Sequence, residues 1–185
     1  KDSVKKVVIE NGITSIGAYA FSGCNNLASI EIPSSVTSIG NGAFSRCSSL
    51  TDITIPSSVT SIGDSAFDSC TGLTSITIPK SVTSIGSYVF DGCTALTEVL
   101  LEGGSTLTSE SFGEVADKVV TRWNEGDLTW TLSADGTTMT ISGSGAMQSY
   151  RLSDSPATQK KDSVKKVVIE NGITSIGAYA FSGCN

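Results

Sequence analysis

Hydrophobic residues recur with a period of 23 along the first half of the chain. Within each period two isoleucines lie two positions apart, as Ile76 and Ile78 do, which predicts a short strand with one face turned inward. A proline ends the strand, and Val82 and Ile85 supply a second inward pair. Four phenylalanines share one position of the period and four cysteines share another, namely Phe21, Phe44, Phe67 and Phe90, and Cys24, Cys47, Cys70 and Cys93. A fixed period of this length is typical of stacked repeats, so we expect a mainly β solenoid with 23-residue coils.

The pattern weakens toward both ends of the solenoid. The first coil has Glu10 where later coils have proline, which is typical of an entry coil, and after Leu101 two glycines interrupt the pattern. One coil buries too few side chains to offset the entropy of ordering its backbone, so each coil depends on its neighbours. In chain order, the expected units are a solenoid over 1–123 with coils near 4–24, 27–47, 50–70 and 73–93 and a degenerate closing coil over 96–123, a β-hairpin insert over 127–147, a polar linker over 148–160, and a duplicate of the first coil over 161–185.

The hairpin is predicted from two alternating segments. Residues 128–132 and 138–142 alternate apolar and polar side chains, and Asp135 and Gly136 between them favour a turn. Trp130 and Met139 would lie on one apolar face of this hairpin. An isolated hairpin is marginally stable in water, so the face must cover another part of the protein.

The duplicate repeats the first 25 residues letter for letter, so 161–185 has the same sequence as 1–25. It carries the face that the first coil uses to dock on 27–47, and the two copies therefore compete for one docking surface. Between molecules, this competition permits a head-to-tail homo-oligomer through 161–185. The candidate self-association residues are Val164, Val167, Ile169, Ile173, Ile176 and Phe181.

Composition excludes several classes of function. Charged residues make up 16% of the chain and the net charge is −6, which disfavours nucleic acid as a partner. No apolar run approaches the about 18 residues of a spanning helix, so we expect no membrane insertion, and the chain shows no signal peptide. The cysteines occupy one position of the repeat, which favours buried thiols over disulfides or a zinc site.

The chain has no histidine, which removes Ser-His-Asp and Cys-His catalysis and most zinc sites. We therefore expect no catalytic residues, no metal and no cofactor, and a protein that is not an enzyme. Acid pairs such as Glu31 with Asp52, or Asp64 with Asp68, leave glycoside hydrolysis open as a minor alternative, although solubility explains these residues.

Outward positions of the first strand in successive coils should form one continuous surface. Repeat proteins commonly bind partners on such a face, because equal spacing offers a long and rigid array of contacts. A simple hydroxyl-rich solvated face is the alternative interpretation. A regular array of threonines, at Thr37, Thr60 and Thr83, also suggests ice binding as a function. Strand propensity and solvation already explain why threonine recurs at this position. The candidate binding residues are Ser29, Glu31, Asp52, Thr54, Ser75, Thr77, Glu98 and Leu100.

The segment Ile55–Phe67, which reads I-P-x-S-V-T-S-I-G-x-x-A-F, resembles the BspA-like leucine-rich repeats of bacterial surface proteins. The resemblance covers about 100 residues and the duplicate. It implies a leucine-rich-repeat solenoid that is extracellular or on the bacterial cell surface and that adheres to a protein or glycoprotein of a host or neighbouring cell. The alternative is a self-assembling filament or spacer built by head-to-tail stacking. The hairpin resembles segments that precede such repeats, which makes 161–185 its expected partner.

Overall fold

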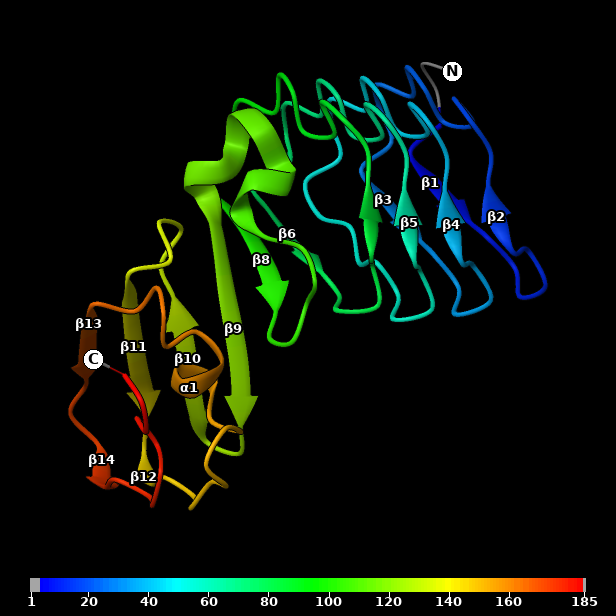
Figure 1. The fold of residues 1–185 in the computed structure, drawn as a ribbon. Coiled ribbons are helices and arrows are strands. Elements are labelled where there is room, and N and C mark those ends of the chain that lie inside the picture. Colours follow the sequence, from blue (N-terminus) through cyan, green and yellow to red (C-terminus); the bar gives the residue numbers. More distant parts are fainter. Residues whose placement is uncertain (1–3, 185) are drawn as a thin grey trace. The chain divides into compact units, whose positions relative to one another are not determined.

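The computed structural model describes residues 4–184, and its contacts divide the chain into two compact units, Lys1–Val119 and Val120–Asn185. The first unit is a stack of coils, coloured blue to green in Figure 1. The second unit is a small sheet with the C-terminal segment beside it. The stack is the mainly β solenoid with 23-residue coils expected from the sequence.

One row of short strands runs along the stack as a four-stranded parallel sheet. Each strand is a Ser-Ile pair whose isoleucine turns inward, and neighbouring strands pair in register at an offset of 23 residues. In order, the strands are β2 (Ser15–Ile16), β4 (Ser38–Ile39), β5 (Ser61–Ile62) and β7 (Ser84–Ile85). The sequence predicted that the isoleucines of this row point inward. The structure adds that their segments form a parallel sheet of their own.

A second row contains the strands predicted from the paired isoleucines. Here β1 (Lys6–Val8) pairs in parallel with β3 (Ser29–Glu31), and β6 (Ser75–Ile78) pairs in parallel with β8 (Glu98–Glu102). The third coil forms no regular strand over 51–56. Its two isoleucines, Ile53 and Ile55, are nevertheless buried, so the inward face is continuous although the strand is irregular.

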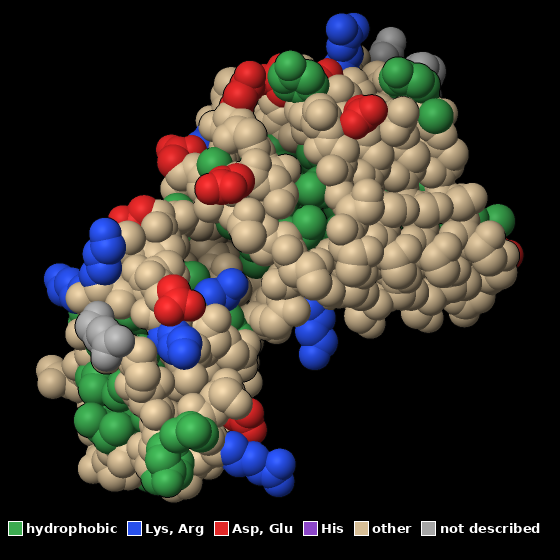
Figure 2. All heavy atoms as spheres, viewed as in Figure 1, with side chains coloured by type: hydrophobic (Ala, Val, Ile, Leu, Met, Phe, Trp, Pro, Cys, Tyr) green, Lys and Arg blue, Asp and Glu red, His purple; other side chains and the backbone are tan. Residues whose placement is uncertain are grey.

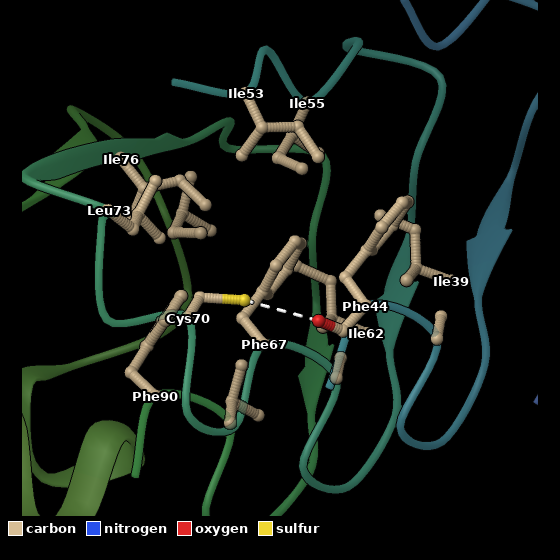
Figure 3. Packing of buried hydrophobic residues seen from close by; sticks show 14 of the residues in the cluster. Ile39, Phe44, Ile53, Ile55, Ile62, Phe67, Cys70, Leu73, Ile76 and Phe90 are labelled. Atoms are coloured by element: carbon tan, nitrogen blue, oxygen red, sulfur yellow. Dashed lines mark hydrogen bonds between the residues drawn. The ribbon is translucent and has the colours of Figure 1, made fainter. Parts of the chain in front are cut away.

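The core of the stack is built on a ladder of phenylalanine rings. Ring centroids of successive coils lie 5.4, 5.3 and 5.7 Å apart, with interplanar angles of 5 to 11°. Phe44, Phe67 and Phe90 stack in this way in Figure 3. Phe112 adds a fifth ring, 6.3 Å from Phe90. The superposition expected from the 23-residue period is confirmed.

A kinked 3₁₀ helix, η1 (Ser109–Lys118), closes the stack. It buries Phe112 and Val115, and Gly113 interrupts the helix with a φ of 52°. The residue pattern of 115–123 favours neither a helical turn nor a strand, and the structure has a helix up to Lys118 and a strand from Val119. The helix ends at Lys118 and the first unit ends at Val119, so the closing coil is shorter than the predicted 96–123.

The hairpin of the second unit is confirmed. Strands β10 (Leu128–Leu132) and β11 (Thr138–Gly143) pair antiparallel, and Trp130 lies opposite Ile141. A third strand, β9 (Val119–Glu125), pairs antiparallel with the other edge of β10 and includes part of the segment 115–123.

The duplicate coil lies beside the hairpin, as its resemblance to segments that precede such repeats implied. Strand β13 (Lys166–Ile169) pairs in parallel with β11, and β14 (Ile173–Ser175) pairs in parallel with β12 (Gly145–Ala146). Trp130 is fully buried between the two parts, with its ring 5.7 Å from Phe181.

The predicted polar linker over 148–160 contains a buried segment that the sequence did not indicate. Residues 155–158 are buried, and they include the short helix α1 (Pro156–Gln159). The Ser155 hydroxyl accepts the backbone N–H of Thr158 at 3.0 Å and donates to the Ala180 carbonyl at 2.6 Å. Small and hydroxyl residues can be buried here because their polar atoms form hydrogen bonds. A prediction of exposure from polar composition alone does not take these bonds into account.

Candidate binding face of the coil stack

The outward row predicted from the sequence lies on one side of the stack. Six of its eight residues are exposed, and the two in the last strand, Glu98 and Leu100, are half-buried. Register places Ser75 beside Glu98 and Thr77 beside Leu100. The exposed six are Ser29, Glu31, Asp52, Thr54, Ser75 and Thr77. The structure therefore gives these side chains the common orientation that the pattern predicted.

The row continues into the first coil, which the sequence analysis missed. Lys6 pairs in register with Ser29, and Val8 with Glu31. The Lys6 Nζ lies 3.5 Å from Glu31 Oε1, in a surface ion pair whose side chains are 61% and 75% exposed. Such a pair contributes about 0–1 kcal/mol, so both side chains remain available to a partner. The signal in the sequence was the offset of 23 between Lys6 and Ser29.

Hydroxyl ladders bind each coil to the one before it. Each serine of one ladder donates to a backbone carbonyl of the preceding coil at 2.6 to 2.8 Å. The threonines at Thr37 and Thr60 donate in the same way at 3.1 and 3.2 Å. The serine donors are Ser35, Ser58 and Ser81. These bonds give the serines and threonines of the repeat a structural role, which weakens the ice-binding interpretation of the threonine row.

The cysteines form a third ladder. The thiols of Cys47, Cys70 and Cys93 donate to the phenylalanine carbonyl of the preceding coil, at Sγ–O distances of 3.1 to 3.2 Å. The bond from Cys70 to the Phe44 carbonyl is the dashed line in Figure 3. These three cysteines and Cys24 are buried and free, as predicted.

Burial gives these thiols little nucleophilic character. It raises the pKa of Cys47 and of Cys93 to about 11 and also raises the pKa of Cys70, because the thiolate would lose its hydration. Since the thiolate is the reactive form, the ladder has a packing role.

The acid pairs considered from the sequence make structural contacts. Glu31 pairs with Lys6, Asp64 Oδ1 accepts the backbone N–H of Ser87 at 2.8 Å, and Asp68 Oδ2 accepts the Ser45 hydroxyl at 3.1 Å. These contacts bind Asp64 and Asp68 to neighbouring coils, which supports a structural interpretation of both residues.

A carboxylate pair that the sequence did not indicate lies at the closing end of the stack. Glu114 hydrogen-bonds to Asp91, and this bond, together with the charge of Asp91, raises the pKa of Glu114. Both residues line a cavity of about 350 Å³ between the fourth coil and η1. No periodic signal marks this pair, because η1 departs from the repeat.

The space-filling view shows how little charge the coil stack carries over most of its visible surface (Figure 2). The eight predicted residues of the outward row are four hydroxyl residues, three carboxylates and the half-buried Leu100, and none of them is aromatic. Such a surface offers hydrogen bonds rather than a hydrophobic anchor.

Comparison with known protein families finds a match in the repeated segments of the chain. The family model for the BspA type leucine rich repeat region matches in six copies, over residues 1–115 and 155–185. No curated protein sequence matches the chain.

Solved leucine-rich-repeat structures are similar over part or all of the chain. A leucine-rich repeat protein from Bacteroides capillosus ATCC 29799 is 33% identical over 55% of this chain and 79% of its own, with a TM-score of 0.46. A second one, from Bacteroides ovatus ATCC 8483, is 19% identical over 98% of this chain and 64% of its own, with a TM-score of 0.47. The pneumococcal vaccine antigen PcpA is 24% identical over 99% of this chain, with a TM-score of 0.47, and the chain spans 47% of its length.

Proposed function

Because the chain belongs to the BspA-type leucine-rich-repeat family of bacterial surface proteins, we propose that it is a non-catalytic binding module of a bacterial cell surface. In this proposal the outward row of the coil stack holds a protein or glycoprotein of a host or neighbouring cell. No helix within residues 4–184 is long and apolar enough to cross a membrane.

The observation that supports this proposal is the regular exposure of the row. Residues on successive coils repeat at a fixed offset, and the ladders of hydrogen bonds behind them hold the coils in register. A partner therefore meets a preformed array and orders few of its side chains on binding, which lowers the entropic cost. Hydroxyl groups and carboxylates suit a hydrophilic partner, such as a glycan-bearing protein.

The test is a binding assay with the intact chain on a panel of immobilised host glycoproteins, including versions stripped of glycans. The double variant Asp52→Lys with Thr77→Lys changes two exposed positions of the row. It should weaken binding of any captured glycoprotein at least tenfold. The control is Thr83→Lys, which places a lysine at an exposed position directly before β7, in the other row. Equal losses for the two rows, or no loss for either, would contradict the proposed face.

A further inference from the structure

The apolar residues predicted for self-association in 161–185 are divided by the fold of the second unit. Val164 is buried, and Ile173 and Phe181 are half-buried against the core of that unit. Half of the predicted set therefore packs within its own unit. The residues that are exposed are Val167, Ile169 and Ile176.

A ladder of backbone hydrogen bonds joins the corners of successive coils in the stack. In each of the first three coils, three N–H groups at alternate residues donate to three carbonyls of the following coil, at 2.7 to 2.9 Å. In the third coil, for example, the Phe67 N–H donates to the Val89 carbonyl at 2.9 Å. The donors in chain order are Tyr19, Phe21 and Gly23, then Gly42, Phe44 and Arg46, then Ser65, Phe67 and Ser69.

This backbone ladder stops at the fourth coil. The equivalent N–H groups, here called the donor row, belong to Tyr88, Phe90 and Gly92, and within residues 4–184 they meet no acceptor. The next segment forms η1, and the carbonyl groups of a helix lie along its axis rather than across to a neighbouring corner. The phenylalanine ladder nevertheless continues, because Phe112 stacks on Phe90 at 6.3 Å, compared with 5.3 to 5.7 Å between the coils.

The donor row has the same backbone conformation as the paired rows. Tyr88 and Gly92 have φ of 56° and 66°, and the equivalent Ser65 and Ser69 have φ of 53° and 57°. A left-handed conformation is uncommon for a bulky residue such as Tyr88. It is held in place by the bonds that this corner receives from the third coil. The three donors are therefore preformed, and an acceptor that meets them orders little additional backbone.

A cavity lies between the fourth coil and η1. Its volume is about 350 Å³, and it is lined by residues 85–91 of the coil, which include Tyr88 and Phe90, and by residues 110–115 of η1. Figure 3 shows Phe90 next to the helix. A volume of this size is within the range of ligand sites in proteins, about 300–1,000 Å³. The cavity therefore gives a ligand access to the side of the coil that carries the donor row.

The charged residues that line this cavity are Asp91, Glu110 and Glu114. Figure 2 shows acidic side chains gathered around this end of the coil stack. Asp91 and Glu114 lie within hydrogen-bond distance of each other, so two like charges face one another when both are ionised. A cation beside them reduces this repulsion. The cavity therefore favours a ligand that brings carbonyl acceptors to the donor row and positive charge to the carboxylates.

We propose that this cavity binds a peptide segment of a partner protein that carries lysine or arginine. Carbonyls at three alternate residues of the peptide accept the N–H groups of the donor row, and its basic side chains contact the three carboxylates. A peptide fits better than a small amine because its main chain supplies several acceptors at a regular spacing. The site shares no residue with the outward row, so this inference does not depend on the proposed function.

The coils indicate which residues the peptide should contain. The middle acceptor in successive coils is the small apolar residue Ala43, Ala66 or Val89. The residue after each outer acceptor has a positive φ, as Gly42 and Arg46 have, which favours glycine there. A probe that meets these conditions and places a lysine at each outer acceptor is acetyl-Lys-Gly-Val-Ser-Lys-Gly-amide.

The first experiment is amide hydrogen exchange of the intact chain, measured by NMR without peptide. The amides of Tyr88, Phe90 and Gly92 should exchange at least tenfold faster than the equivalent amides of the second coil, which are paired with the third coil. Equal exchange in the two coils would overturn the proposal, because it would mean that the donor row already has acceptors.

The second experiment repeats the measurement with the probe peptide at millimolar concentration. The peptide should slow exchange of the three donor-row amides at least tenfold and leave the amides of the second coil unchanged. The mirror-image peptide has the same charges but presents its carbonyls in a different geometry, so it should give no protection. Absence of protection by the first peptide, or equal protection by both, would contradict the proposal.

Charge variants test the carboxylates. The triple variant Asp91→Asn, Glu110→Gln and Glu114→Gln should lower the affinity for the probe peptide at least tenfold in an NMR titration. The matched control removes three exposed acids outside the cavity, through Glu10→Gln, Asp52→Asn and Glu170→Gln. Equal losses in the two triple variants, or no loss in the first, would overturn the proposal.

A last variant separates this site from the outward row. The double variant Asp52→Lys with Thr77→Lys, designed to weaken glycoprotein binding, should still bind the probe peptide and protect the donor row. Loss of protection in this variant would place the peptide on the outward row and would overturn the proposed cavity site. Retained protection together with unchanged glycoprotein binding would contradict the proposed function alone.

Discussion

The glycine after each Ser-Ile strand sets how closely the coils approach, and its replacement tests the stacking directly. A Cβ on Gly63 would lie 2.6 Å from the Asn41 backbone nitrogen and 2.8 Å from the Gly40 carbonyl carbon. Ordinary van der Waals contacts of a Cβ begin at 3.4 Å, so the two coils must separate locally. Gly17 occupies the same position of the first coil, where a Cβ would meet no atom within 4 Å. Neither glycine has a positive φ, so alanine introduces no dihedral strain at either.

The magnitude follows from three contributions. Overpacking costs about 1–3 kcal/mol, and separating the coils weakens the bond from the Gly63 N–H to the Ile39 carbonyl, 2.8 Å long, which contributes about 1 kcal/mol. Alanine also lowers the conformational entropy of the unfolded chain, which stabilises the folded state by about 0.4–1 kcal/mol. Gly63→Ala should therefore lose about 1–3 kcal/mol of unfolding free energy, whereas Gly17→Ala should be neutral or gain up to about 1 kcal/mol.

Urea unfolding followed by far-ultraviolet circular dichroism measures the two variants. Both tryptophans, Trp123 and Trp130, lie in the second unit, so tryptophan fluorescence provides an internal control that should be the same for both variants. Equal stability of the two alanine variants would refute the argument, because it would mean that the close approach of the coils at Gly63 does not limit the side chain.

Three further predictions concern the ladders. Phe67→Ala should lower the free energy of unfolding in urea by about 3–5 kcal/mol, because the Phe67 ring is fully buried between two others. Phe21→Ala should lower it less, because Phe21 is half-buried. Ser58→Ala should cost about 0.5–1.5 kcal/mol in the same assay, because it removes the bond to the preceding coil and leaves a carbonyl unpaired. Above pH 9 the unfolded chain loses thiol protons that Cys47 and Cys93 retain when folded, so stability should fall as pH rises toward 11, by about 1.4 kcal/mol per pH unit for each thiol. Urea midpoints between pH 8 and 11 check this slope, which should be shallower in Cys47→Ala.

The 23-residue period was sufficient to predict the coils and the phenylalanine ladder, because each inward position recurs at the same offset and meets its own equivalent. It did not predict the backbone geometry of the corners. Ser65 and Ser69 both adopt a left-handed conformation, with φ of 53° and 57°. Glycine occupies the equivalent positions in some coils only, at Gly42 and Gly92, so residue type alone does not mark these corners. Their conformation is imposed by the bonds to the adjacent coils.

The candidate face was predicted for the same reason, since outward positions follow from inward ones. The Asp91–Glu114 pair was not, because it joins the last regular coil to a helix that departs from the repeat. The buried segment 155–158 was missed because its side chains are polar or small. In both places tertiary contacts determine the structure, and the local pattern carries little information about them.

The duplicate shows most directly where inference from sequence ends. Any rule based on local residue pattern must assign Ile16 and Ile176 the same environment, yet one is buried and the other exposed. The difference arises because a coil has two flanks and each requires a neighbour, so burial is a property of the pair of coils rather than of the segment.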